Sequence, residues 1–171
     1  MRPTIPLDQW RIAVDLRATQ SVQNQEGLPA VGCTCKSCAN WSHVWKAAFS
    51  DSIREQLERL QIDVAHPSEL YAFEEASGGA HTRVIFHVVG KLLSGPNAWR
   101  EDENAGTSLV YHSVSEARFA TGLVVVPSTQ TFNPRPRTLK NTEEDLLQID
   151  FRLFVPSSRT ELHVSRQRDE A

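Results

Sequence analysis

The order of the strand-like segments constrains the fold of this chain most strongly. From residue 70 onward, each apolar segment is predicted to be a strand, and no helical pattern separates one segment from the next. A parallel sheet needs a crossover helix between consecutive strands, so these strands are expected to pair in an antiparallel way. The predicted strands cover residues 70–74, 84–89, 108–114, 119–126 and 147–155.

A first strand and two short helices are predicted before these segments. Trp41, Val44 and Ala48 recur at helical spacing, which places them on one face of a short helix. Ser52 and Glu55 have the spacing of a capping box, which predicts that a second helix begins at Ser52. Apolar and polar residues alternate over 10–17, which indicates the first strand. The predicted fold is therefore α+β: a mostly antiparallel sheet with one or two short helices packed on one face.

The chain is expected to form a single domain over residues 1–171. A chain of 171 residues with 40% hydrophobic and 23% charged residues can bury an ordinary core without disulfides. The core is predicted to cover about residues 8–156, followed by a polar C-terminal tail over 157–171. Polar stretches predict loops at 19–32, 100–107 and 129–142.

Charge and composition exclude several classes of partner. A net charge of −3 gives no overall field that would attract nucleic acid. No apolar run approaches the roughly 20 residues that a membrane span needs. The N-terminal residues do not have the pattern of a signal peptide, and an odd number of cysteines favours a reducing compartment. We therefore expect a cytoplasmic protein with no nucleic-acid or membrane partner.

All three cysteines lie within six residues, at Cys33, Cys35 and Cys38, and His43 follows five residues later. Three thiolates and an imidazole are a ligand set that zinc accepts in tetrahedral sites. The spacing therefore predicts a zinc site made by Cys33, Cys35, Cys38 and His43. Three other histidines are alternatives to His43 as the fourth ligand: His81, His87 and His112.

Three other interpretations of the cysteines stay open at the level of sequence. The cysteines are small buried side chains that hold the turn into the helix, or Cys35 and Cys38 form a redox pair, or one cysteine acts as a nucleophile with a histidine. In each case Cys38 is expected to be more buried than Cys33, because it lies closer to the aromatic face of the predicted helix.

Several short motifs, in their order along the chain, resemble a family of small uncharacterised bacterial proteins. The first is a Cys-x-x-Cys-x-Asn-aromatic segment, here Cys35 to Trp41, and the second is a Leu-Gly-Ile-Asp-like turn, here with Gln61 in place of the glycine. Further similar segments are Pro67-Ser68-Glu69, Phe86-His87-Val88-Val89-Gly90 and Leu153-Phe154-Val155-Pro156. The resemblance covers roughly residues 10–156 and implies no established activity.

The sequence contains no complete catalytic constellation and no cofactor fingerprint, which favours a non-catalytic cytoplasmic protein that binds another protein. Neutralisation of a toxin, as in immunity proteins, is one version of this hypothesis, by analogy with other small acidic α+β domains. The alternative is a metal- or thiol-dependent enzyme centred on Cys33, Cys35 and Cys38.

Overall fold

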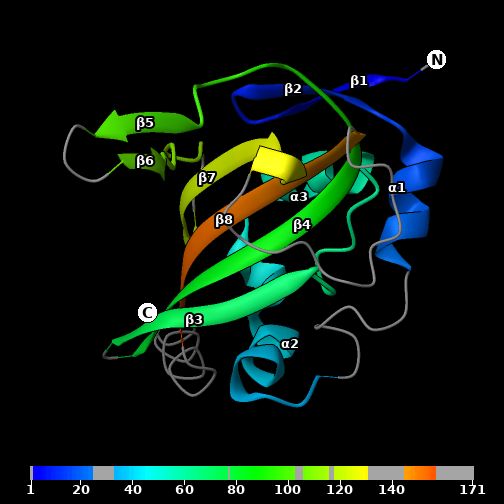
Figure 1. The fold of residues 1–171 in the computed structure, drawn as a ribbon. Helices are drawn as coiled ribbons and strands as arrows, with labels where there is room; N and C mark the ends of the chain where they lie inside the picture. Colours follow the sequence, from blue (N-terminus) through cyan, green and yellow to red (C-terminus); the bar gives the residue numbers. More distant parts are fainter. Residues whose placement is uncertain are drawn as a thin grey trace, which may run out of the picture.

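The computed structural model describes residues 2–24, 33–76, 78–102, 106–115, 118–130 and 145–156. A six-stranded antiparallel sheet forms the centre of the molecule, which confirms the predicted fold class (Figure 1). Its strands are β1 (Thr4–Leu7), β2 (Trp10–Val14), β3 (Glu69–Ala76), β4 (Gly79–Ser94), β7 (Ala120–Pro127) and β8 (Leu146–Pro156). A separate hairpin consists of β5 (Trp99–Asp102) and β6 (Gly106–Leu109), and the helices are α1 (Leu16–Gln23), α2 (Lys36–Ala48) and α3 (Asp51–Arg59), with a 3-10 turn at Ser128–Gln130.

The central strand, β4, organises the sheet. It has 16 residues, and along one edge its first half pairs with β3 while its last part pairs with β2. Its other edge pairs with β8 over eleven residue pairs, and β7 completes the order β1-β2-β4-β8-β7. The prediction that residues 84–89 form a central strand is confirmed.

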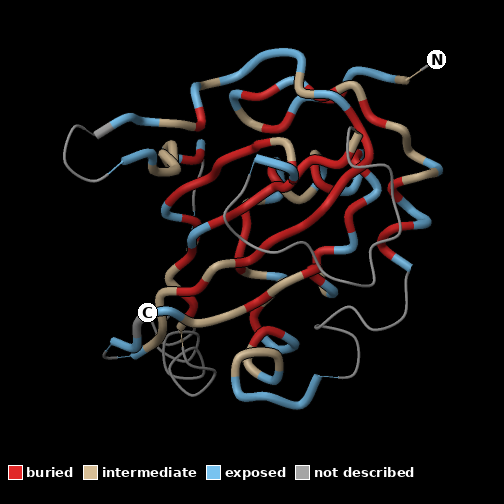
Figure 2. Tube along the Cα trace, in the orientation of Figure 1, coloured by how far each residue is buried: buried red, intermediate tan, exposed pale blue. Residues whose placement is uncertain are grey.

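The main core lies on one face of this sheet, under α2 and α3. Val84, Phe86 and Val88 of β4 are fully buried there, as Figure 2 shows for the central strands. Trp41 of α2 is buried on this face and donates its indole N–H to the carbonyl of Val64 at 3.1 Å, which satisfies its polar group. The predicted helical face of α2 is therefore the face that covers the sheet.

The start of α3 differs from the predicted capping box. Ser50 is the N-cap, and its hydroxyl accepts a hydrogen bond from the backbone N–H of Ile53 at 3.2 Å. Ser52 lies inside the first turn, so the prediction that it caps the helix was wrong. The helix begins at Asp51 because Ser50, two residues before the predicted cap, supplies the acceptor for the N–H of Ile53.

Residues 16–23 form α1, whereas the sequence predicted a loop from residue 19. Asp15 caps this helix by accepting a hydrogen bond from the N–H of Ala18 at 3.0 Å. Val22 packs with Val89 and Leu146 on the sheet face opposite the main core. These contacts, a hydrogen bond from Gln23 to the carbonyl of His87 and the cap stabilise a helix that has too few apolar residues to show a clear period.

The predicted loop at 100–107 was also wrong, because β5 and β6 pair as a hairpin there. Ala98 beside this hairpin packs on Val124 and Val126 of β7, so the hairpin covers part of the same sheet face as α1. Two predicted loops or tails, 131–142 and 157–171, lie outside the described residues. Among the helices of the described part, none is long and apolar enough to cross a membrane.

Candidate metal centre

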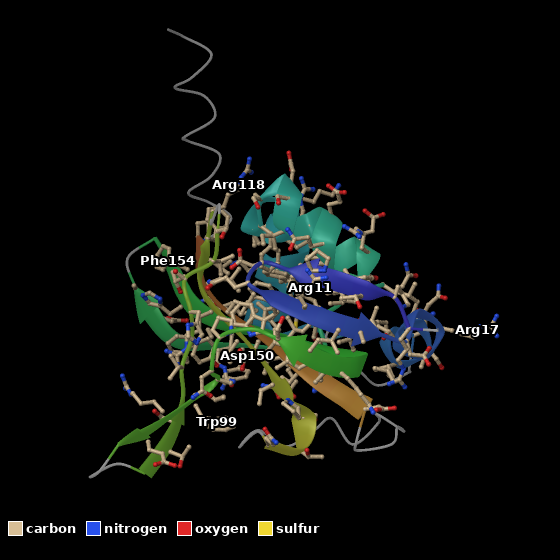
Figure 3. All side chains as sticks on the ribbon, turned by 90° about the horizontal axis from the view of Figure 1, so that it is seen from above. Arg11, Arg17, Trp99, Arg118, Asp150 and Phe154 are labelled. Carbon is tan, nitrogen blue, oxygen red and sulfur yellow. The ribbon has the colours of Figure 1, made fainter. Side chains whose placement is uncertain are left out.

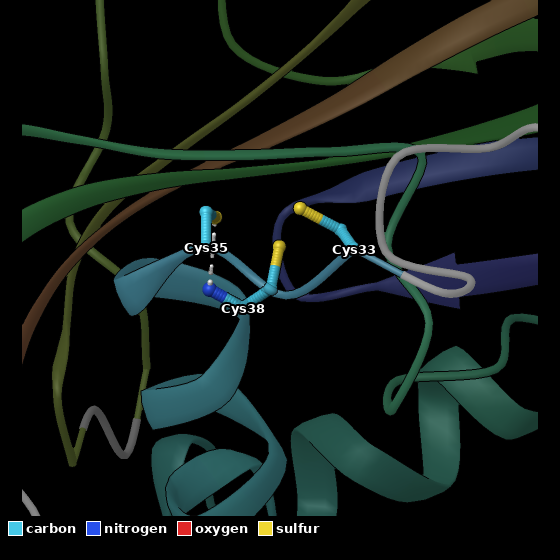
Figure 4. Close-up of side chains that lie close together, drawn as sticks. All are labelled: Cys33, Cys35 and Cys38. Carbon is cyan, nitrogen blue, oxygen red and sulfur yellow. Dashed lines mark hydrogen bonds between the residues drawn. The ribbon is translucent and has the colours of Figure 1, made fainter.

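The three cysteines come together at the N-terminus of α2. Cys35 is the N-cap residue, and its extended backbone turns the chain into the helix. Its sulfur accepts a hydrogen bond from the backbone N–H of Cys38 at 3.5 Å, shown as the dashed line in Figure 4. Cys33 precedes this turn and Cys38 lies in the first helical turn. The helix start therefore positions two of the sulfurs, and the preceding residues bring the third to them.

The sulfur atoms of Cys33, Cys35 and Cys38 all lie within 4.8 Å of one another, and none of them is in a disulfide. Zinc–thiolate bonds of about 2.3 Å in a tetrahedral site separate two sulfurs by about 3.8 Å. A shift of about 1 Å, within the reach of side-chain rotation, would bring the most distant sulfurs to that separation. The cluster therefore fits a thiolate-bound metal ion.

The local electrostatics distinguish the thiols. The backbone N–H of Cys38, with a hydrogen bond from the thiol of Cys33, lowers the pKa of Cys35 to about 7. Partial burial, followed by the neighbouring Cys33 and Cys35, raises the pKa of Cys38. A thiolate at Cys35 is thus present near neutral pH, and thiolate is the form that binds metal ions.

The predicted difference in burial between Cys38 and Cys33 is confirmed. Cys33 and Cys35 are exposed, while Cys38 is half-buried and packs against the main core beside α2. The interpretation that all three cysteines are buried structural side chains is therefore wrong for Cys33 and Cys35.

The predicted fourth ligand, His43, does not join the cysteines. Among the described residues, the group of candidate ligands contains three cysteines and no histidine. His43 lies two turns into α2 and lines a groove of about 520 Å³ beside that helix. The floor of this groove consists of small residues of the β3–β4 hairpin, among them Ala72, Gly79 and Ala80.

The three alternative histidines lie elsewhere in the fold. His81 of β4 contacts the rings of Phe73 and Phe154, and His87 is fully buried on the sheet face covered by α1. His112 packs edge-on against the ring of Trp10 at 5.8 Å. The described structure thus brings together three of the predicted ligands and places none of the four predicted histidines with them.

Sequence reasoning missed a buried polar network on the sheet face opposite the main core. Asp150 of β8 is fully buried and accepts hydrogen bonds from Arg83, Tyr111 and Gln148. Figure 3 shows Asp150 in the centre of the molecule, away from the helical layer and on the same side as Trp99 of the β5–β6 hairpin. The alternation of β8 does not show whether Asp150 is buried, and Arg83, which lies diagonally across from it on β4, was the available signal.

The remaining charged clusters show no ligand geometry in the described residues. Glu75 forms an exposed ion pair with Lys36 at 3.0 Å, and Asp145 pairs with Arg2 at 2.6 Å. These contacts link chain segments at the surface.

The chain matches no protein-family model, no curated protein sequence and no solved structure. The resemblance to small bacterial proteins therefore stays a prediction. The geometry of Cys33, Cys35 and Cys38 is the basis for any function of the cysteines.

Proposed function

We propose that this protein binds a zinc ion through Cys33, Cys35 and Cys38. The observation that carries the proposal is the convergence of three sulfurs within 4.8 Å at a helix start. The lowered pKa of Cys35 supports it, because less proton release is needed before the first thiolate can bind. The ion would join the residues before α2 to its first turn, and solvent or an external ligand would complete the tetrahedron.

A metal- or thiol-dependent enzyme is the alternative to a non-catalytic role. A cysteine nucleophile is activated by a histidine within about 3 Å of its sulfur, or by a thiol pKa that is lowered at a helix N-terminus. In the described part of the chain, no histidine belongs to the cysteine group. A cysteine–histidine enzyme is therefore less supported, whereas a metal-dependent enzyme stays the alternative, because three protein ligands are also the number found in catalytic zinc sites. A cytoplasmic location accompanies the proposal, because a reducing compartment keeps the three thiols available to a metal.

Elemental analysis of the purified full chain tests the zinc site. We expect one zinc per chain, and we expect a chelator to lower the melting temperature. Cys33→Ser, Cys35→Ser and Cys38→Ser should each abolish zinc binding, whereas His43→Ala should retain it. Substitution by cobalt gives a second readout, because thiolate ligands produce a charge-transfer absorption that the three serine variants would lose. Retention of zinc by all three serine variants would refute the proposal.

A second candidate function is non-catalytic binding to another protein, with neutralisation of a toxin as one version. The observation that favours it is Phe73 on the edge strand β3, a large apolar residue that is 48% exposed. Arg152 of β8 lies against this ring, with its guanidinium carbon 5.7 Å from the ring centre. Exposed aromatic and arginine side chains are enriched in protein–protein interfaces. The selection experiment described below tests this function.

A further inference from the structure

An aromatic–arginine strip lies on the sheet face opposite the main core, toward the β3–β4 hairpin. We define it by five residues from β3, β4, β8 and the segment before β7: Phe73, His81, Tyr111, Arg152 and Phe154. Ring contacts of 5.9 Å and 5.2 Å join His81 to Phe73 and to Phe154. The guanidinium of Arg152 lies 4.0 Å from the ring centre of Tyr111, so the strip is continuous.

Two members of the strip are exposed. Phe73 is one of two large hydrophobic residues that are exposed in the described structure, the other being Leu93 on a distant part of β4. Arg152 is exposed, and in the described ranges it forms no ion pair. It stands directly opposite Arg83 in the ladder between β4 and β8. Like charges in this position repel, but the carboxylate of Asp150 neutralises Arg83, so the positive charge that remains belongs to Arg152.

The strip is held in place from beneath. The hydroxyl of Tyr111 donates to buried Asp150 at 2.9 Å. Its side chain also lies against Gly122, where an added Cβ would come within 2.9 Å of the Cβ of Tyr111. Tyr111 is therefore fixed on the sheet and fixes the guanidinium of Arg152 above it. A rigid arginine loses less conformational entropy when it binds a ligand.

We propose that the strip is a docking surface for a segment of a partner protein that presents a carboxylate side chain. The proposal rests on the second candidate function, non-catalytic protein binding. Arg152 would pair with the carboxylate through its outward N–H groups, and Phe73 would cover an apolar neighbour on the same segment.

Charge favours a protein partner over a single-stranded nucleic acid. Nucleic acids bind to grooves with several cations that follow the phosphate backbone. Within the described ranges, the arginine of the strip has no acidic partner, and the chain has a net charge of −3. One arginine between aromatic rings matches a single carboxylate on an otherwise apolar segment.

Display of random twelve-residue peptides, selected against the full-length protein, tests this proposal. The same library is selected in parallel against Arg152→Glu, and the most enriched peptides are synthesised and titrated by fluorescence anisotropy. The reversed charge is compatible with folding, because it places a glutamate opposite Arg83 on the neighbouring strand. Arg11→Glu on β2, another exposed strand arginine, and Leu93→Ala serve as matched controls.

We expect peptides selected by the wild type to be enriched in aspartate and glutamate. Their affinity should fall at least tenfold in Arg152→Glu and in Phe73→Ala and stay unchanged in both controls. Peptides selected by Arg152→Glu should instead be enriched in lysine and arginine. Such an exchange of preference would not follow from a purely structural role of the arginine.

Three results would overturn the proposal, and they separate it from the function on which it rests. If the selected peptides are neutral but their binding depends on Phe73, the proposed carboxylate is wrong, and protein binding at the strip still holds. If the affinity of the selected peptides is unchanged in both Phe73→Ala and Arg152→Glu, the strip is not the docking surface. If a labelled oligothymidylate binds more tightly than every selected peptide, the proposal of a protein partner is wrong as well.

Discussion

Replacing Asp150 with asparagine should destabilise the protein by an amount that the surrounding hydrogen bonds define. The carboxylate is fully buried and accepts hydrogen bonds from Arg83 Nε at 3.3 Å, Gln148 Nε2 at 3.0 Å and the Tyr111 hydroxyl at 2.9 Å. A second nitrogen of Arg83 also contacts it as an ion pair. Asparagine keeps the volume of the side chain, so the substitution removes the charge without creating a cavity.

The magnitude follows from the burial of the charge left behind. The side chain of Arg83 is only 15% exposed, so its guanidinium would remain largely desolvated without a counterion. Removal of one partner from a buried ion pair costs about 3–5 kcal/mol. The hydroxyl of Tyr71 still accepts a hydrogen bond from Arg83, and a part of the guanidinium reaches solvent. We therefore expect a loss of about 3 kcal/mol, at the lower end of that range.

Equilibrium unfolding in urea, followed by tryptophan fluorescence, measures this loss. Glu75→Gln is the matched control, because it removes a carboxylate whose side chain is 72% exposed, and it should cause no measurable change. Combining Asp150→Asn with Arg83→Met should cost about 2 kcal/mol less than the sum of the two single changes. An effect of Asp150→Asn no larger than that of Glu75→Gln would refute the reasoning, because the charge would then need no buried counterion.

Three further predictions concern separate parts of the chain. Gly95→Ala should destabilise the protein by about 1–3 kcal/mol in the same unfolding assay, because an added Cβ would lie 2.2 Å from Trp10 Cδ1. Ser50→Ala should cost about 1 kcal/mol through loss of the N-cap of α3, whereas Ser52→Ala should cost nothing measurable. With a chelator present, alkylation of Cys35 should reach half its maximal rate near pH 7, because its lowered pKa of about 7 keeps the thiolate down to that pH. Peptide mass spectrometry should find alkylation of Cys38 only at higher pH, where its raised pKa is approached.

Strands β2 and β8 could be predicted because apolar and polar residues alternate along them, whereas β1 and β5 were not predicted. The same alternation could not tell which polar residues are buried. Gln148, Asp150 and Arg152 follow one another at intervals of two on β8, yet the first two are buried and the third is exposed. Their burial depends on α1 and the β5–β6 hairpin, which cover only part of that face. Those two elements lack a strong apolar period, so the sequence predicted loops in their place.

The spacing of the cysteines suggested the cluster, but the turn into α2 creates it, because an extended chain could separate Cys33 from Cys38 by about 17 Å. The fourth ligand was not predictable. Whether His43 reaches the cluster depends on the rotation of α2 about its axis, and burial of Trp41 and Val44 fixes that rotation. This orientation places His43 along the groove beside the hairpin, away from the sulfurs. Packing of the apolar face of α2 therefore keeps His43 away from the three cysteines.

The zinc site and the aromatic–arginine strip should act independently. The cysteines lie beside α2, on the face of the sheet that carries the main core, whereas the strip lies on the opposite face. Two described contacts come nearest to a link: the ion pair between Lys36 and Glu75, whose side chains are 88% and 72% exposed, and the hydrogen bond from Asn40 Nδ2 of α2 to the carbonyl of Pro156 at 3.2 Å. An exposed ion pair and one hydrogen bond contribute little free energy and should not transmit a large change between the two sites. Removal of zinc with a chelator should therefore leave the affinity of a selected acidic peptide unchanged in an anisotropy titration. A change of more than threefold, reversed by added zinc, would show that the sheet transmits the state of the cysteines to its other face.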